Sequence, residues 1–283
     1  MTRQLRLPPG LEEEWSAETA WLAGLPRLAA ELAADWGLRL EQPFATPRSL
    51  VVPAGDVVLK LNAPGHFEAD HEADALAAWK GRGAVRLLAR DEERRALLVE
   101  RCRPGTELAG SGADEEAVVA DLLPRLAVTP SEPYPFRRLV DEADRWAEEV
   151  PARFASGGRP FERSLLSFAV DVFTSADRSA GSLVNQDLHG WNILRATREP
   201  WLVIDPKPLV GEAELSGVGL LRNAAFRGGV PEARRWLDVL ASCSLDRERA
   251  QAWGVAHALA WGWTEREGWS RRSIEAARAI RAA

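Results

Sequence analysis

A change of pattern near residue 102 constrains the fold more than any other feature of this sequence. Before it, the β-rich runs Ser49–Val52 and Asp56–Leu61 flank Ala54-Gly55, which predicts an antiparallel hairpin with Gly55 in the turn. After Cys102-Arg103-Pro104-Gly105-Thr106 the chain reads as helical for most of its length. A small sheet followed by a helical region predicts an α+β chain with two lobes.

The remaining elements of the first region complete a small sheet that carries one helix. Residues 11–36 read as two amphipathic helices divided at Pro26. A helix is predicted from about His66 to Lys80, and strands are predicted over 84–88 and 96–101. We therefore predict an N-terminal lobe over 1–101, a hinge over 102–112 and a helical C-terminal lobe over 113–283. In the last lobe we expect helices near 113–127, 136–150, 161–176, 217–227, 231–242, 246–264 and 270–282, and strands only near 193–196 and 201–204.

Composition narrows the classes of partner. The 283 residues carry a net charge of −6, with acids and bases interspersed, so neither duplex nucleic acid nor an anionic membrane is an expected partner. Cys102 and Cys243 form no Cys-x-x-Cys pair, which argues against a zinc ribbon or a disulfide framework. The start at Met1–Arg6 shows no signal peptide, and no apolar run approaches the roughly 18 residues of a membrane span. We expect a cytoplasmic monomer.

Three groups of residues stand in an order that suits phosphoryl transfer. Asp187 is followed five positions later by Asn192, and the strand Trp201–Ile204 ends on Asp205. Transfer of a γ-phosphoryl group needs a carboxylate that orients the acceptor hydroxyl, oxygen ligands for Mg²⁺, and a cation on the α and β phosphates. Asp187 suits the first task, and Asn192 and Asp205 suit the second. Lys60 of the predicted hairpin can supply the cation, with Glu72 holding it as an ion pair.

Each of these residues also has an ordinary structural interpretation. Asp187 can cap a turn through its side chain, and Asp205 before Pro206 is a common way to open a loop. A single lysine on a strand or a single glutamate in a helix is usually solvated. The joint order and spacing favour a kinase over these readings. A two-metal phosphoesterase needs more histidines than His66, His71 and His257 supply, and P-loop, Rossmann and hydrolase-elbow motifs are absent from the sequence.

These residues lie in motifs that resemble the aminoglycoside phosphotransferases, within their streptomycin 6-kinase and hydroxyurea phosphotransferase branch. The resemblance covers roughly residues 45–225. It is carried by the segments Val57–Lys60, His71–Leu76, Gly81–Leu88, Ala96–Arg101 with Arg103-Pro104-Gly105, Gln186–His189 with Asn192, Arg198–Lys207, and Leu220–Asn223. The runs Gly81–Leu88 and Glu199–Lys207 are specific to this branch rather than to kinases in general.

The resemblance implies a two-lobed, protein-kinase-like fold, ATP or another nucleoside triphosphate as donor, and Mg²⁺. By position, Asp187 is the implied catalytic base. Lys60 and Glu72 form the implied phosphate-binding pair, and Asn192 and Asp205 the implied metal ligands. The backbone of Glu100 and Cys102 is implied to meet the adenine edge at the hinge.

The sequence departs from many kinases of this fold at two places. Asn185-Gln186 stands where a His-Gly pair often precedes the catalytic aspartate, and the nucleotide-covering loop Phe44–Ser49 has no glycine. We expect Arg48 or Ser49 to contact phosphate in place of the missing backbone amides.

The acceptor stays open at this point. We expect a small hydroxylated molecule, either a streptomycin-like aminoglycoside or related antibiotic, or a sugar or other metabolite. A non-catalytic nucleotide-binding protein of the same fold is the alternative outside enzymes. For an aminoglycoside, which is cationic, acids on the later helices are candidates, although each suits a solvated surface at least as well. These acids are Asp171, Asp177, Glu265 and Glu267.

Overall fold

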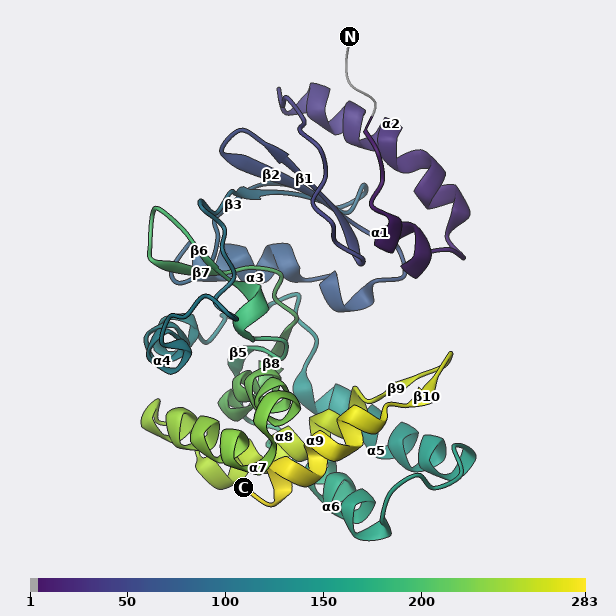
Figure 1. The fold of residues 1–283 in the computed structure, drawn as a ribbon, viewed down its shortest axis with the longest axis vertical. Helices are drawn as coiled ribbons and strands as arrows, with labels where there is room; N and C mark the ends of the chain where they lie inside the picture. Colours follow the sequence, from purple (N-terminus) through teal and green to yellow (C-terminus); the bar gives the residue numbers. More distant parts are fainter. Residues whose placement is uncertain (1–4) are drawn as a thin grey trace. The chain divides into compact units, whose positions relative to one another are not determined.

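The computed structural model describes residues 5–283, which form two compact units (Figure 1). The first unit is the chain up to Thr106 together with Leu194–Asp205, and the second is Glu107–Ile193 together with Pro206–Ala283. The expectation about a signal peptide rests largely on Met1–Gln4, which lie outside the described residues. The lobe boundaries at 101 and 113 stay a prediction. In the described part of the chain no helix is long and apolar enough to cross a membrane.

A four-stranded antiparallel sheet is the centre of the first unit. Its order is β1 (Ser49–Ala54), β2 (Val57–Asn62), β4 (Ala96–Glu100) and β3 (Leu87–Asp91). Ala54 pairs with Val57 across a two-residue turn in which Gly55 has φ +64°, so the predicted hairpin is confirmed. The predicted strand over 84–88 instead begins at Leu87, because the preceding residues Gly83–Val85 bond to Val203.

Two N-terminal helices cover one face of this sheet. Helix α1 (Pro9–Glu14) and helix α2 (Thr19–Asp35) contribute Leu11, Leu25 and Leu32 to an apolar cluster that includes strand residues of β1 and β2. The predicted division at Pro26 is wrong, because Pro26 lies inside α2 and the chain turns at Trp15–Glu18 instead. Leu25 and Ala29 are buried on either side of Pro26, and this packing offsets the cost of a proline in a helix.

Alternation along β2 separates an apolar face from a charged face. Leu59 and Leu61 join the apolar cluster under α1 and α2. Because neighbouring side chains on a strand point to opposite faces, Lys60 and Asn62 point the other way, toward helix α3 (Glu72–Trp79). Figure 1 shows α2 and α3 on opposite sides of the sheet. The short 3₁₀ helix η1 (Phe67–Ala69) leads into α3.

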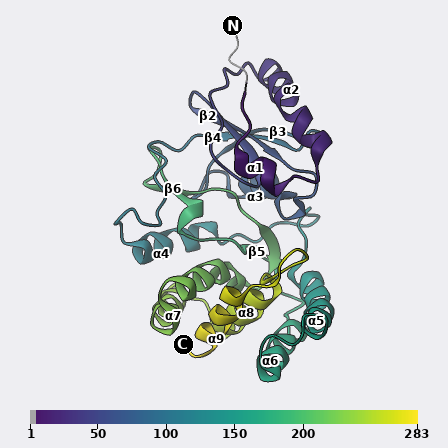
Figure 2. The ribbon, with the colours of Figure 1, turned by 45° about the vertical axis from the view of Figure 1, so that its right-hand side comes forward.

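The second unit is mainly helical. Helices α7, α8 and α9 lie side by side, and α5 packs against α6 (Figure 2). The helix α7 contains a break at Gly229 (φ +59°, ψ −139°), where two separate helices were predicted. The bounds of the helices are α4 Glu115–Leu126, α5 Leu139–Ser156, α6 Arg163–Thr174, α7 Val218–Ser242, α8 Arg247–Ala260 and α9 Arg271–Arg281.

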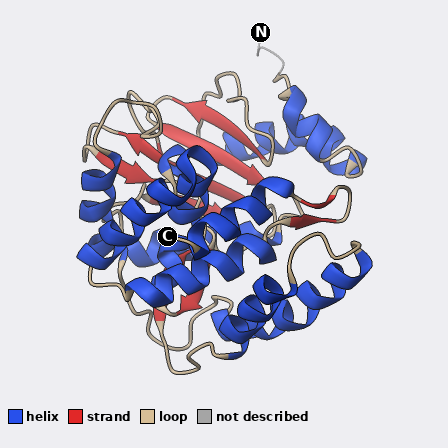
Figure 3. Ribbon diagram, turned by 60° about the horizontal axis from the view of Figure 1, so that its bottom comes forward, coloured by secondary structure: helices blue, strands red, loops and turns tan. Residues whose placement is uncertain are grey.

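Three two-stranded pairs occur beyond the hinge, and the expectation of only two strands there is wrong (Figure 3). The predicted pair is present as β6 (Ile193–Arg195) and β7 (Trp201–Val203). The sequence reading missed β5 (Ser182–Asn185) with β8 (Pro208–Gly211), and β9 (Trp263–Thr264) with β10 (Gly268–Trp269). Strand β5 leads directly into the polar stretch that contains Asp187, which is followed by the 3₁₀ helix η2 (Gly190–Asn192). Another 3₁₀ helix, η3 (Ala213–Gly217), leads into α7.

Candidate active site

Lys60 and Glu72 form a buried ion pair in the first unit. The Lys60 Nζ atom lies 2.8 Å from Glu72 Oε1 and 2.6 Å from Glu72 Oε2. Lys60 is only 7% exposed and Glu72 only 2%, so both charges are removed from water. Burying a charge is costly unless a partner compensates it, which explains why each residue needs the other. The predicted contact between the strand lysine and the helix glutamate is confirmed, while its role in phosphate binding stays a prediction.

Asp205 is a second partner of Lys60, which the sequence reading did not foresee. The Lys60 Nζ atom donates to Asp205 Oδ1 at 2.6 Å. Asp205 follows β7 and has φ +49°, a conformation that aspartate tolerates better than most residues. Burial lowers the pKa of Lys60, but the charges of Asp205 and Glu72 outweigh it and raise the pKa above its ordinary value. Lys60 therefore stays a cation.

Two polar residues near this cluster hold Glu72 in place. Asn62 Nδ2 donates to Glu72 Oε2 at 3.2 Å, and Ser49 Oγ donates to Asn62 Oδ1 at 2.6 Å. The sequence contained a signal for Asn62, because it stands two residues after Lys60 on the same face of β2. Ser49, expected as a possible phosphate contact, has its hydroxyl hydrogen committed to Asn62.

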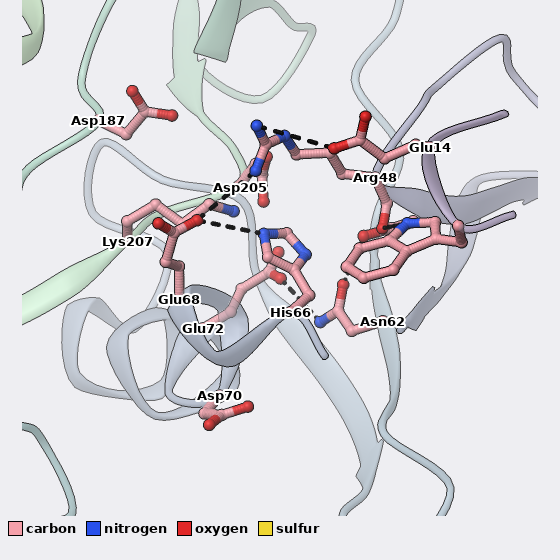
Figure 4. A network of polar contacts seen from close by, with 12 residues as sticks. Glu14, Arg48, Asn62, His66, Glu68, Asp70, Glu72, Asp187, Asp205 and Lys207 are labelled. Carbon is pink, nitrogen blue, oxygen red and sulfur yellow. Dashed lines mark hydrogen bonds and ion pairs between the residues drawn. The ribbon is translucent and has the colours of Figure 1, made fainter. Parts of the chain in front are cut away.

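Arg48 is held by acids on either side of the glycine-free loop. Its guanidinium nitrogens lie 3.9 Å from Glu14 Oε1 and 3.7 Å from Glu68 Oε2 (Figure 4). Trp15 Nε1 donates to the carbonyl of Arg48 at 3.1 Å, so α1 and the residues after it support the loop. Side chains from outside the loop therefore hold Arg48.

The residues predicted to form the hinge lie at the end of β4. Glu100 forms an ion pair with Arg198, with Arg198 Nε at 2.8 Å from Glu100 Oε1, and its backbone N–H donates to Arg86 O. Burial raises the pKa of Glu100, but the hydrogen bonds from Arg198 and from the Arg86 amide have the larger effect. The pKa of Glu100 is therefore below its ordinary value. Cys102 is a free, buried thiol whose pKa is raised to about 12 by burial and by the charge of Glu100. Cys102 therefore offers no reactive thiolate.

In the second unit, the stretch after β5 is built around the side chain of Asn185. Asn185 Oδ1 accepts from the backbone N–H of Asp187 at 3.1 Å and from that of Lys207 at 2.9 Å. It thereby ties the loop that carries Asp187 to the chain just before β8. The Asn185-Gln186 pair, which departs from the common His-Gly pattern, supplies supporting hydrogen bonds of its own.

Asp187 itself contacts two basic side chains. Arg222 Nη2 donates to Asp187 Oδ1 at 2.8 Å, and His189 Nε2 lies 3.5 Å from the same oxygen. Burial raises the pKa of Asp187, but the opposing effect of His189, Arg222 and Lys207 is larger. The pKa of Asp187 therefore falls below its ordinary range. Asp187 is therefore a carboxylate at neutral pH. The sequence reading assigned no role to Arg222.

Asn192 is oriented by the same loop. Its Nδ2 atom donates to Asp187 O at 3.1 Å and lies 3.4 Å from His189 Nε2. Because the carbonyl of Asp187 needs a donor, the amide nitrogen of Asn192 faces this carbonyl and the amide oxygen faces away from it. An amide oxygen and the carboxylate of Asp205 are the ligand types that Mg²⁺ prefers, so the residues fit the implied metal. No cluster of three or more His, Cys, Asp or Glu residues suited to a metal occurs within residues 5–283.

The predicted site residues thus fall into two sets. The first unit contains Lys60, Glu72 and Asp205 in direct contact, with Glu100 and Cys102 at the end of the sheet. The second unit contains Asp187 and Asn192 in one loop.

The four acids considered for a cationic acceptor are all exposed to solvent. They are Asp171, Asp177, Glu265 and Glu267. Trp269 packs on Phe161 and Trp263, so its ring is part of the aromatic packing of this region.

A comparison with protein families decides the identity of the fold. The family described as aminoglycoside/hydroxyurea antibiotic resistance kinase matches residues 39–268. The chain belongs to this family. It is 37% identical to the streptomycin 6-kinase of Streptomyces griseus over 275 residues, covering 90% of this chain and 89% of the relative. It is also 37% identical to the hydroxyurea phosphotransferase of Kitasatospora aureofaciens over 259 residues, covering 86% and 74%.

A solved structure agrees on the fold. The choline kinase LicA of Streptococcus pneumoniae superimposes with a TM-score of 0.66 at 15% identity, over 92% of this chain and 99% of the other. At this identity the likeness speaks for the fold alone. The predicted α+β, kinase-like fold is confirmed.

Proposed function

We propose that this protein transfers the γ-phosphate of ATP to a hydroxyl group of a streptomycin-like aminoglycoside. The observation that carries the proposal is the buried Lys60, which keeps both carboxylate partners that kinase chemistry requires. A non-catalytic relative would have no need to retain this costly charge cluster together with Asp187. Membership of the antibiotic kinase family supports the same conclusion.

In the proposed reaction the charged residues have separate tasks. Lys60 binds the α and β phosphates, with Glu72 holding its side chain in place. The backbone of Glu100 and Cys102 receives the adenine edge. Asp187 orients the acceptor hydroxyl, whose oxygen attacks the γ phosphorus. The bond from that phosphorus to the β–γ bridging oxygen breaks, ADP leaves, and Asp187 accepts the proton of the hydroxyl.

Asn192 and Asp205 are the proposed ligands of Mg²⁺. When bound, the ion neutralises charge on the phosphates of the nucleotide. The contact between Asp205 and Lys60 keeps this carboxylate ordered before nucleotide arrives. Arg48, on the loop between α2 and β1, is proposed as a further phosphate contact.

Hydroxyurea is a second candidate acceptor. It rests on one observation, which is that the hydroxyurea phosphotransferase is as similar to this chain as the streptomycin 6-kinase is. The reaction would be the same, with the hydroxyl group of hydroxyurea in place of that of the aminoglycoside.

The test is phosphate transfer from ATP labelled at the γ position, in the presence of Mg²⁺, to separate acceptors. The panel contains streptomycin, a second aminoglycoside of different ring pattern, hydroxyurea and simple sugars. We expect a labelled streptomycin product, and nuclear magnetic resonance of that product identifies the hydroxyl that carries the phosphate. Labelling of a sugar alone would replace the antibiotic with a metabolite as substrate.

A further inference from the structure

Arg222 is a buried cation in direct contact with Asp187, and the proposed mechanism gives it no task. It lies in the first turns of α7, and only 9% of it is exposed. Its Nη2 atom donates to Asp187 Oδ1 at 2.8 Å. Among residues 5–283, the contacts of Arg222 and His189 are both to Oδ1, and the other carboxylate oxygen of Asp187, Oδ2, accepts no hydrogen bond. Arg222 therefore occupies one specific oxygen of the proposed base.

The other side of the guanidinium faces His257 of α8. Arg222 Nη1 lies 3.4 Å from His257 Nδ1, and His257 Nε2 lies 3.2 Å from Gln186 Oε1. A guanidinium can only donate, so His257 Nδ1 must accept and the ring proton must be on Nε2. His257 then donates that proton to Gln186, the residue before Asp187. Arg222 is thus connected to the Asp187 loop twice, directly through Asp187 and indirectly through His257 and Gln186.

Burial keeps this histidine neutral. His257 is completely buried, and its pKa is lowered well below the ordinary value by burial and by the charge of Arg222, against an opposing effect of Asp187. A neutral ring with one defined tautomer is able to accept from Arg222 and donate to Gln186 at the same time.

Aromatic rings fix the plane of the guanidinium. The Trp261 ring centroid lies 5.1 Å from Arg222 Cζ and 4.6 Å from the centroid of the His257 ring. The ring centroids of Trp146 and His257 lie 5.7 Å apart, with the two rings nearly perpendicular. Cation–π contact and close packing leave the Arg222 side chain little freedom. Neighbouring side chains therefore cannot easily rearrange to replace Arg222, and its loss should change the position of the Asp187 carboxylate.

We propose that Arg222 is the positioning residue of the catalytic aspartate, with His257 and Gln186 fixing its direction. By occupying Oδ1, Arg222 fixes the rotation of the carboxylate and presents Oδ2 to the acceptor hydroxyl. Since the acceptor must lie in line with the γ phosphate, a wrongly rotated carboxylate lowers the rate of transfer and leaves nucleotide binding unchanged. The inference rests on the proposed function for its kinetic part, and its tautomer part stands independently.

The kinetic test compares Arg222→Met and Arg222→Lys with the wild type. For Arg222→Met we expect kcat to fall about a hundred-fold, as misplacement of a catalytic group does, with the KM for ATP within about two-fold of the wild type. Lysine restores the charge but has a single nitrogen in place of the two that reach Asp187 and His257, so Arg222→Lys should recover only part of the loss. Arg227→Met is the control, since Arg227 lies on the same helix and pairs with Glu115 away from Asp187. A kcat for Arg222→Met within two-fold of the wild type would overturn the proposal.

A second pair of variants covers the case in which Arg222→Met does not fold. His257→Asn keeps an acceptor near the Nδ1 position, whereas His257→Leu removes it. We expect His257→Asn to keep most of the wild-type kcat and His257→Leu to lose about ten-fold or more, as loss of a supporting hydrogen bond does. Equal kcat values for the two variants would contradict the network.

The tautomer is measured without any acceptor. Nitrogen-15 chemical shifts of the wild-type histidines should show His257 neutral and protonated at Nε2 at pH 7. A His257 protonated at Nδ1 would overturn the inference even if the enzyme is active. An enzyme inactive on every acceptor would refute the proposed function, and the shift measurement would still decide the network.

Discussion

At the scale of single residues, the central feature is a lysine whose positive charge is paired with two carboxylates. Lys60 contacts Glu72 and Asp205 in a buried setting, so its removal would leave two carboxylates without their cation. The same cation is available to a nucleotide, because phosphate oxygens bind an ammonium group in the way these carboxylates do.

We predict that Lys60→Met raises the dissociation constant for ATP by about ten-fold or more, as the loss of a charged hydrogen bond to phosphate does. The melting temperature should also fall, because Glu72 is left buried and uncompensated. Lys80→Met is the control, since Lys80 is exposed at the end of α3. Unchanged ATP affinity by calorimetric titration would remove Lys60 from the nucleotide site.

Asp205, the proposed carboxylate ligand of Mg²⁺, can be substituted with little change to the backbone. Asn tolerates the left-handed backbone at φ +49° as well as Asp does, so Asp205→Asn changes the charge with little strain. We predict that the Mg²⁺ concentration for half-maximal activity rises at least several-fold, because one carboxylate ligand is lost. A magnesium titration that superimposes on the wild type would exclude Asp205 from the metal site.

The sequence predicted the contact of Lys60 with Glu72 because motif order implies it. It did not predict the contacts of Arg222 and His257, which are 35 and 70 residues from Asp187. Arg222 lies in the matching segment Leu220–Asn223, but that motif assigns it no partner. Only the crossing of α7 and α8 near Asp187 reveals them. Asn185 was identified only as a departure from the common His-Gly pattern, and its side chain accepts a hydrogen bond from the backbone of the loop itself.

At the scale of elements, the local helix propensity of α2 and its packing against the sheet favour different structures. Proline predicts a break, but the apolar cluster with the sheet needs Leu25, Ala29 and Leu32 on one continuous helical face. Tertiary burial therefore decides the outcome. Strands β5 and β8 are four residues each and were not predicted, because such short runs leave almost no periodic signal.

The approach of α7 to the Asp187 loop gives a prediction of its own. A Cβ atom on Gly219 would lie 2.5 Å from Leu188 O and 3.0 Å from Leu188 N, so the helix and the loop touch through their backbones. We predict that Gly219→Ala displaces the loop and lowers kcat about ten-fold or more, since misplacement by a fraction of an ångström is costly. Urea denaturation should also show lower stability.

A matched glycine in a helix controls for the effect of alanine alone. A Cβ atom on Gly24 of α2 would meet nothing within 4 Å. Gly24→Ala should therefore raise the free energy of unfolding by about 0.5–1 kcal/mol and leave kcat unchanged. If Gly219→Ala behaves like Gly24→Ala, the close packing of α7 against the loop is wrong.

At the scale of the whole molecule, the chain passes between the two units at residues 106–107, 193–194 and 205–206. The second and third passages flank the segment that carries β7 and Asp205. The proposed phosphate-binding cation thus belongs to one unit and the proposed base to the other, and the short segment 194–205 belongs with the cation. The pattern break at residue 102 indicates a division of the chain, but nothing in the sequence marks the return of 194–205 to the first unit.

Stability of the second unit should depend on pH through Glu212. Its carboxylate accepts from Arg249, the Trp253 indole and the Asp177 amide. Burial raises the pKa of Glu212, but these bonds outweigh it and lower the pKa. A lowered folded pKa means that the stabilisation is complete above the unfolded pKa of about 4.3 and is lost as the pH falls through the folded pKa.

We predict that Glu212→Gln lowers the free energy of unfolding at pH 7 by about 1.5–3 kcal/mol, as loss of charged hydrogen bonds does. The variant should also lose less stability than the wild type on acidification below about pH 4.3, which urea denaturation at several pH values measures. Glu248→Gln is the control, since Glu248 is exposed in the first turn of α8. Parallel pH curves for Glu212→Gln and the wild type would contradict this account.

Asp187→Asn in the presence of Mg²⁺, ATP and streptomycin tests the central claim most directly. The substitution keeps the size of the side chain and removes the charge that we propose orients the acceptor and takes its proton. We predict that the dissociation constant for ATP stays within about two-fold of the wild type while the rate of transfer falls by at least about a hundred-fold, the lower end for loss of a general base. Transfer at the wild-type rate by Asp187→Asn would contradict the assignment of Asp187 as the catalytic base.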